Sequence, residues 1–363
     1  MKIIACCGYH ATGSGVIDDL LREMDNVADA VYGAELRILH DTDCISDLEY
    51  HLVKDPHRLC TGLAIRRFVE YCKSQSRMEE KIFGKNWMRL VQDYADSLII
   101  NKYKGWIDAD IPFMPIWRRR FAWLERAFFY VMRNKKIAPY VPKCLSRPRW
   151  YDYYPNYVTY YSHLTENDFM RKTHSFIENL CSLINVDNKE YLVLDQFVCP
   201  HNPMRDLKYV DDMKVIVVDR DPRDLYVHEM LNKSHVLPKD PKQFAVQYRL
   251  MRELSAPDDP TKVLRVKYED MIFHYESMVP KVLDFLGIDS SHHKFPFKHF
   301  NPSVSINGTQ LWIYKTHRFV NAVKIIENEL PDMLYDYPNE AVRKSIVSRM
   351  DSKLAIKEYA TKH

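Results

Sequence analysis

The first 24 residues constrain the fold most, because strand, glycine turn and helix follow one another without a gap. Residues 2–7 form an apolar run typical of a short buried strand, and residues 8–15 contain three glycines. From residue 16 to residue 24, apolar side chains recur with helical spacing. A strand, a turn of small residues and a helix in this order begin a parallel α/β unit.

The α/β pattern resumes in the second half of the chain. Residues 191–194, 214–218 and 262–266 are runs of strand type, and residues 35–39 are a further strand candidate near the start. A helix after the last run stops at Gly287, a normal C-terminal glycine. We therefore expect one doubly wound, mainly parallel α/β domain over residues 1–363, whose ligands bind beyond the carboxyl ends of the strands.

A large insertion, at about residues 54–188, reads as helical and shows no clear strand. Residues 113–133 look like a long amphipathic helix whose apolar face favours ordinary core packing. Residues 101–150 carry twelve Lys and Arg against three acids, which predicts an anionic neighbour. The aromatic residues at 150–161 fit sugar stacking or core packing, and a basic aromatic helix also fits peripheral contact with an anionic membrane.

Composition excludes several classes of protein. A hydrophobic content of 46% predicts a sizeable core, and a formal charge of +3 gives no overall indication of nucleic-acid binding. The eight cysteines form no CxxC pair and no metal-ligand spacing, so we expect reduced thiols, no metal and a cytoplasmic location. We find neither a signal peptide nor the roughly 20 apolar residues of a membrane-spanning helix.

The glycine turn has the spacing of a phosphate-binding loop. Gly8 and Gly13 are separated by four residues, and backbone N–H groups in such a turn can face one anion. A nucleoside triphosphatase would place Lys directly after the second glycine, where this chain has Ser14. This argues against ATP or GTP hydrolysis, but a turn of this kind can also simply shape a corner of the fold.

A second phosphate-binding turn is indicated after the run at 214–218. Pro222 suits the first turn of a helix, and Asp221 suits its N-cap. Arg220 and Arg223 at this positive helix end favour a bound anion. The alternative is that the two arginines pair with Asp219 and Asp224.

Four blocks of the sequence resemble the sulfotransferase family in the family's own order. They are the turn at 12–14, the segment 217–224, the segment 266–271 with the helix end at 282–287, and more weakly residues 305–315. Together they cover roughly residues 1–40 and 190–320, and the chain is most similar in character to microbial carbohydrate sulfotransferases. The family's P-loop-like α/β fold agrees with the pattern above.

This resemblance implies 3′-phosphoadenosine 5′-phosphosulfate as the co-substrate, a glycan acceptor and no metal. The 5′-phosphosulfate would lie at the first turn, and the 3′-phosphate at the second. The implied donor-site residues are Thr12, Gly13, Ser14, Gly15, Arg220, His228, Asn307, Gly308 and Lys315.

The sequence departs from the family's pattern at two positions. The family usually has Lys or Arg just before the Ser/Thr-Gly pair, where this chain has Ala11 preceded by His10. It also has Ser eight residues after the arginine, where this chain has His228. Either histidine can act as a substitute cation or donor, since the ordinary pKa of histidine lies close to neutrality.

No catalytic base is clearly marked. Asp195 ends a strand at the expected edge of the sheet, and the alternative of equal weight is that it caps the next loop. His10 is the other candidate, and His201 is a distant third. Two rivals to an active sulfotransferase stay open: a non-catalytic nucleotide-binding relative of the same fold, and a P-loop-type nucleotide kinase.

Overall fold

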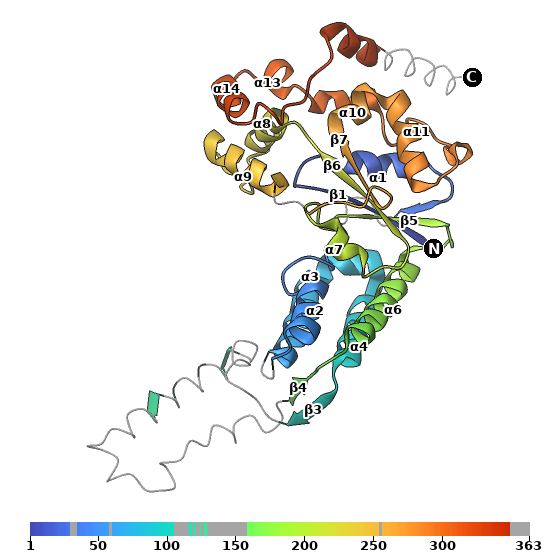
Figure 1. The fold of residues 1–363 in the computed structure, drawn as a ribbon, viewed down its shortest axis with the longest axis vertical. Coiled ribbons are helices and arrows are strands. Elements are labelled where there is room, and N and C mark those ends of the chain that lie inside the picture. Colours follow the sequence, from blue (N-terminus) through green and yellow to red (C-terminus); the bar gives the residue numbers. More distant parts are fainter. Residues whose placement is uncertain are drawn as a thin grey trace. The chain divides into compact units, whose positions relative to one another are not determined.

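The computed structural model describes residues 1–29, 35–57, 60–104, 158–253 and 256–348, with a few helical residues between 116 and 128 (Figure 1). The chain divides into two compact units. The first comprises residues 1–40, 81–83 and 177–363, and the second comprises residues 41–80 and 84–176. The second unit overlaps most of the predicted insertion, while the single-domain interpretation stays a prediction.

The first unit is built on a five-stranded sheet in the order β2-β5-β1-β6-β7. All four neighbouring pairs are parallel. Its strands are β1 (Lys2–Gly8), β2 (Val27–Asp29), β5 (Tyr191–Asp195), β6 (Met213–Asp219) and β7 (Val263–Lys267). The predicted α/β class with a mainly parallel sheet is confirmed.

The central strands are long apolar runs because both of their faces are covered. Residues 3–8 of β1 and 215–218 of β6 are buried throughout, as expected for strands in the middle of a parallel sheet. Cys6 and Cys7 in β1 are fully buried and behave as small hydrophobic residues.

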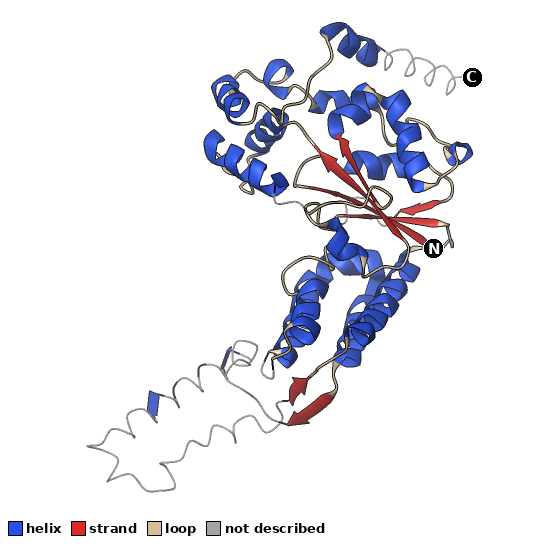
Figure 2. Ribbon diagram, in the orientation of Figure 1, coloured by secondary structure: helices blue, strands red, loops and turns tan. Residues whose placement is uncertain are grey.

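One face of the sheet packs against three helices. Helices α1 (Gly15–Leu21), α10 (Tyr268–Phe273) and α11 (Tyr275–Leu286) share a hydrophobic cluster with Ile4, Ile216 and Val266 of the strands. Figure 2 shows these helices next to one another on that side of the sheet. Gly287 ends α11 with a φ of +78°, as predicted for a C-terminal glycine.

A second cluster joins helices from the later part of the chain. It contains α8 (Pro222–Asn232), α9 (Pro241–Glu253), α13 (Leu311–Tyr314) and α14 (Val320–Glu329). Short elements complete this unit, namely α7 (Pro203–Leu207), η6 (Ser290–His292), α12 (Pro302–Ser305) and η7 (Ile306–Gly308).

The second unit is mainly helical. Its elements are α2 (Ile45–Glu49), η1 (Tyr50–Lys54), α3 (Thr61–Phe83, whose end belongs to the first unit), η2 (Gly84–Asn86), α4 (Trp87–Leu98), β3 (Asn101–Lys104), β4 (Val158–Tyr161) and the first half of α6 (Glu166–Ile184). Aromatic packing holds its helices together, with Tyr94 and Phe176 stacked at 4.4 Å and Phe68 edge-on to both.

Three expectations from the sequence are wrong. Residues 35–39 are not a strand: Glu35 makes one bridge to Asp195, and the apolar residues after it pack as a buried turn. The insertion does contain strands, because β3 and β4 pair antiparallel. Both strands are rich in Lys and Tyr and form no apolar run, so the sequence pattern did not predict them.

The third concerns residues 113–133, most of which lie outside the described residues. The described ones are helical, but Trp117, Leu124 and Phe128 are exposed, which contradicts core packing at these three positions. The aromatic stretch at 150–157 also lies outside the described residues. Within the part of the chain that the structure describes, no helix combines the length and the apolar character that a membrane span requires.

Candidate functional site

The turn between β1 and α1 has an unusual backbone. His10, Ala11 and Gly13 adopt φ values of +92°, +49° and +90°, a region that favours glycine. A non-glycine residue held there costs about 1–3 kcal/mol, and such strain persists where surrounding contacts enforce it. A Cβ atom on Gly13 would lie 2.5 Å from the ring of Tyr268, so this position requires glycine for space as well.

The hydroxyl groups of the turn are already bound within the protein. Thr12 is 1% exposed and donates to the carbonyl oxygen of Val218 at 2.7 Å. Ser14 donates to Asp195 Oδ1 at 3.2 Å and accepts from Gln196 Nε2 at 3.0 Å. What Thr12 and Gly13 offer to an anion is therefore their backbone N–H groups rather than side chains.

Asp195 lies at the carboxyl end of β5, directly beside the turn. Burial, with a smaller contribution from the nearby Glu35, raises the pKa of its carboxyl to about 6, although the hydrogen bond from Ser14 opposes the change. The group is ionised at pH 7 and is a better proton acceptor than an exposed aspartate. Asp195 and the first phosphate turn thus meet at one edge of the sheet.

Arg220 follows β6 and is 4% exposed. Its Nη1 donates to the carbonyl oxygen of Ala11 at 3.0 Å, and its Nη2 donates to that of Gly308. The guanidinium lies over the ring of Tyr268, and its Nε is buried with no partner. Within the described ranges no carboxylate forms an ion pair with Arg220, and Asp224 interacts with this buried charge only over a longer distance.

The other charges of the second turn are satisfied. Asp221 caps α8 by accepting from the backbone N–H of Arg223, and Pro222 occupies the first helical position, both as predicted. Arg223 pairs with Asp221 and Glu327. The alternative in which both arginines pair with Asp219 and Asp224 is wrong.

Each of those two aspartates has other partners. Asp219 pairs with Arg252 and Lys267 from the neighbouring helix and strand. Asp224 accepts from the backbone N–H groups of Gln310 and Leu311 at 2.8 and 2.7 Å. The acids of this block thus brace the fold around Arg220.

The segment 306–311 lies against Arg220 because buried groups hold it there. Asp224 anchors its end, as just described, and Arg343 donates to Thr309 Oγ1 and to the carbonyl oxygen of Ile306. A Cβ on Gly308 would lie 2.6 Å from the hydroxyl of Tyr268. Of the predicted residues here, Gly308 contacts Arg220, whereas Asn307 and Lys315 are exposed.

The two histidines of interest lie near Arg220. His228 is half-buried on α8, and burial lowers its pKa, with further lowering from Arg220, Lys315 and His10. His10 Nε2 lies 3.3 Å from Glu229 Oε1. The structure therefore brings His10, Arg220, His228 and Lys315 into one electrostatic neighbourhood. His201 is exposed and contacts Cys199 instead.

Sequence reasoning missed Glu229, and it did not foresee the packing role of Tyr268 or the anchoring role of Asp224. Glu229 is 2% exposed, and it follows Leu225 by four residues on the same face of α8. The sequence offered no clear indication, because Asn232 and Lys233 follow on the same face one turn later. The role of Tyr268, which separates two glycine-dependent loops, has no counterpart in the sequence pattern.

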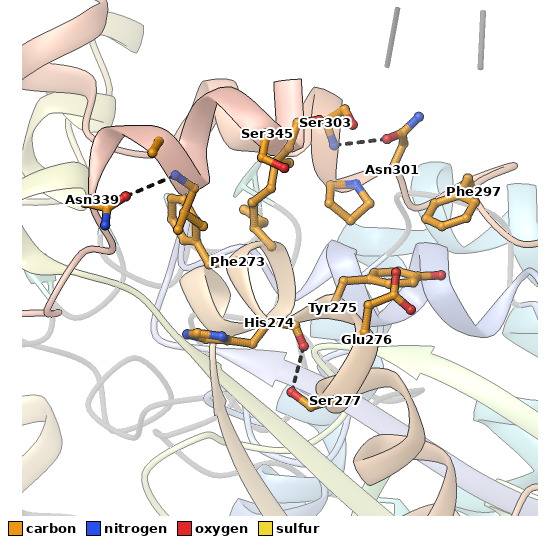
Figure 3. Close-up of a pocket in the computed structure, with 15 residues that line it drawn as sticks. Phe273, His274, Tyr275, Glu276, Ser277, Phe297, Asn301, Ser303, Asn339 and Ser345 are labelled. Atoms are coloured by element: carbon orange, nitrogen blue, oxygen red, sulfur yellow. Dashed lines mark hydrogen bonds between the residues drawn. The ribbon is translucent and has the colours of Figure 1, made fainter. Parts of the chain in front are cut away.

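A well-formed cavity lies elsewhere in the first unit. It has a volume of about 810 Å³ and is lined by residues from 272–277, 297–303 and 339–346, including Tyr275 and Ser303 (Figure 3). None of the predicted donor-site residues lines it. Among the described residues, no group of three or more His, Cys, Asp or Glu is arranged to hold a metal ion.

Comparison with known protein families and with curated proteins gives no match for this sequence. Several solved structures resemble it at low identity, three of them as follows. The sulfotransferase domain from the curacin biosynthetic pathway has 10% identity and a TM-score of 0.37, over 96% of this chain and 97% of that one. The sulfotransferase domain from the Synechococcus PCC 7002 olefin synthase has 11% identity and a TM-score of 0.39, over 93% and 96%.

The third is retinol dehydratase in complex with androsterone and the inactive cofactor PAP. It has 13% identity and a TM-score of 0.33, over 93% of this chain and 83% of that one. With TM-scores below 0.5, none of these similarities decides the function of this chain.

Proposed function

We propose that the chain is a sulfotransferase that binds 3′-phosphoadenosine 5′-phosphosulfate and transfers its sulfuryl group to a hydroxyl or amine of a carbohydrate. The observation that carries the proposal is Arg220, a buried guanidinium with an unpartnered Nε and no carboxylate partner among the described residues. A bound phosphate would supply a close counter-ion. The loops of Ala11 and Gly308, which Arg220 joins, would enclose the nucleotide.

The roles follow from the positions of the residues. The backbone of residues 12–15 would hold the 5′-phosphosulfate, and Arg220 with His228 would hold the 3′-phosphate. Lys315 and the backbone of residues 307–308 would close over the nucleotide. The protein then contributes mainly position and positive charge, which is what transfer of a sulfuryl group between oxygens requires.

In the proposed reaction, the acceptor oxygen attacks sulfur and forms a new S–O bond. The bond between sulfur and the 5′-phosphate oxygen breaks, and adenosine 3′,5′-bisphosphate leaves with the bonding electron pair. The acceptor's proton passes to a base, for which Asp195 is the first candidate because its pKa of about 6 leaves it ionised yet basic at pH 7. His10 is the second candidate.

The carbohydrate acceptor rests on composition alone. Residues 101–150 have a surplus of nine positive charges, which would attract an acidic glycan. Peripheral contact with an anionic membrane rests on the same charges. A cytoplasmic location is likewise a proposal.

A transfer assay tests the activity. A donor labelled with radioactive sulfur is incubated with uronic-acid oligosaccharides, with neutral oligosaccharides and with a simple phenol. We expect label on the acidic oligosaccharides, lost in Arg220→Ala and retained in Arg249→Ala, which removes a partly exposed arginine paired with Asp332. Label only on the phenol would contradict the glycan acceptor.

A non-catalytic nucleotide-binding protein is the second candidate. The observation that favours it is that the hydroxyls of Thr12 and Ser14 are both engaged within the protein. It predicts tight binding of adenosine 3′,5′-bisphosphate without transfer to any acceptor. A kinase would instead bind ATP more tightly than the bisphosphate, and the lack of Lys at position 14 counts against it.

A further inference from the structure

Glu229 is a buried carboxylate without an obvious structural partner. It is 2% exposed, and its Oε1 lies at ion-pairing distance from His10 Nε2, 3.3 Å away. Neither His10 Nε2 nor Glu229 Oε2 makes a hydrogen bond. In the described part of the chain, His10 is the one cationic group that pairs with it. Burying a carboxylate is costly unless a positive group compensates it, and His10 is placed to do so when it carries a proton.

His10 is held at the edge of the first phosphate turn in a conformation that histidine rarely adopts. Its φ is +92°, and its side chain keeps 38% of its exposure while one ring nitrogen faces Glu229. Between Gly8 and Gly15 it is the one side chain able to carry a positive charge. A protonated imidazole here would stand beside any anion bound by the turn.

The carboxylate of Glu229 lies near several groups that carry or can carry a positive charge. Arg220, Lys315, Glu229 and His10 all act electrostatically on His228. A carboxylate on its own would weaken anion binding at such a site. A carboxylate that holds a neighbouring imidazole in its charged form has the opposite effect.

We propose that Glu229 is a positioning residue that pairs with the imidazole of His10 and places His10 as the cation of the first phosphate turn. The inference rests on the proposed function in that the anion is taken to be the nucleotide sulfate donor. The pairing itself is independent of the nucleotide. Both parts are therefore tested, one without ligand and one with it.

The first test is a double-mutant cycle without nucleotide. The unfolding free energy of wild type, His10→Gln, Glu229→Gln and the double variant is measured in urea at pH 5.5 and pH 8.5. We expect favourable coupling between the two positions at pH 5.5 that is lost as the pH rises, because histidine loses its proton in this range. The cycle subtracts what His228 contributes on its own, because His228 is present in all four proteins. Equal coupling at both pH values overturns the pairing.

The second test is calorimetric titration with adenosine 3′,5′-bisphosphate at pH 6. Simple removal of a negative charge in Glu229→Gln would tighten binding, whereas the proposal predicts binding about three- to tenfold weaker. Glu253→Gln, which removes an exposed carboxylate paired with Arg249, should change nothing. The loss should be absent in the His10→Gln background. Binding of the bisphosphate to Glu229→Gln should be restored when His10→Lys is added, because the lysine ammonium stays charged without a carboxylate beside it.

The outcomes separate the two proposals. Tighter binding in Glu229→Gln, or a loss that persists in the His10→Gln background, overturns the positioning role. No binding of the bisphosphate to wild type, together with pH-dependent coupling in the first test, refutes the nucleotide site and leaves the His10–Glu229 pair established.

Discussion

At the scale of single residues, the site depends on groups whose surroundings alter their ordinary behaviour. Gly13 packs closely against the ring of Tyr268, and the carboxyl of Asp195 has a raised pKa. Arg220 is a buried charge with no carboxylate paired to it among the described residues. Each of them contacts backbone or side chains from a distant part of the sequence. We therefore expect a substitution at one of these positions to change stability or activity differently from the same substitution at another residue of that type.

Gly13 and Gly15 make a matched pair. Gly13→Ala would place a Cβ 2.5 Å from the Tyr268 ring at a φ of +90°, whereas Gly15→Ala meets no atom within 4 Å. We expect Gly13→Ala to lower the unfolding free energy by about 1–3 kcal/mol and Gly15→Ala to change it by less than about 0.5 kcal/mol. Urea denaturation of both variants measures this. Equal losses would mean that Tyr268 does not pack on the turn as described.

Asp195→Asn should separate activity from stability. Burial raises the folded-state pKa of this carboxyl from 3.8 to about 6, so its stabilising contribution is full below about pH 4 and is lost as the pH rises through 6. At pH 7.5 the neutral amide should therefore raise the unfolding free energy by about 1–2 kcal/mol, while sulfuryl transfer falls at least about 100-fold.

Thermal unfolding and the transfer assay follow the two effects of Asp195→Asn. Asp168→Asn is the control. Hydrogen bonds from Thr165 and Arg171 lower the pKa of that carboxyl, so replacing it by an amide should not raise the unfolding free energy. For wild type, the acid limb of the rate profile should fall near pH 6. A rate independent of pH between 5 and 8 would exclude Asp195 as the base.

At the scale of elements, the site is assembled by polar anchors between segments. Asp224 on α8 binds the backbone N–H groups of residues 310 and 311, and the hydroxyl of Tyr337 also donates to it. These bonds hold the segment that presents the Gly308 carbonyl to Arg220. Asp224 and Leu311 are 87 residues apart in the sequence, so their positions along the chain do not predict this contact.

Asp224→Ala should release this segment. Removing the acceptor leaves two buried N–H groups unpaired, which costs about 2–4 kcal/mol of stability. Hydrogen exchange at Gln310 and Leu311 should accelerate by at least about tenfold. Exchange in α11 should accelerate only as far as the lower stability of the whole protein requires. Unchanged protection at these two amides would show that Asp224 is not their anchor.

How much of each element the sequence predicts depends on where its stabilisation originates. The strands at 191–195 and 213–219 were predicted within one residue at each end, since parallel strands buried on both faces must be apolar runs. The cap at Asp221 and the stop at Gly287 followed from local backbone chemistry. Residues 35–39 misled because their buried side chains pack as a turn, and burial alone does not distinguish a turn from a strand.

At the scale of the whole molecule, the sheet order explains why the candidate residues meet. β1 lies between β5 and β6, so the turn after β1, Asp195 after β5 and Arg220 after β6 all emerge at one edge. The sequence placed these residues at strand ends and thereby predicted this edge. It gave no access to Glu229 or Tyr268, because their roles arise from burial against partners far away in the sequence.

The most direct test of the central claim is a thermal-shift titration with adenosine 3′,5′-bisphosphate, ATP and 5′-AMP on wild type, Arg220→Ala and Arg249→Ala. The bisphosphate at 100-fold above its dissociation constant should stabilise wild type and Arg249→Ala by about 2.7 kcal/mol. It should do so at concentrations at which the other two nucleotides have little effect, and Arg220→Ala should lose the response. No shift with the bisphosphate, a larger shift with ATP, or an undiminished shift in Arg220→Ala would contradict a sulfate-donor site built around Arg220.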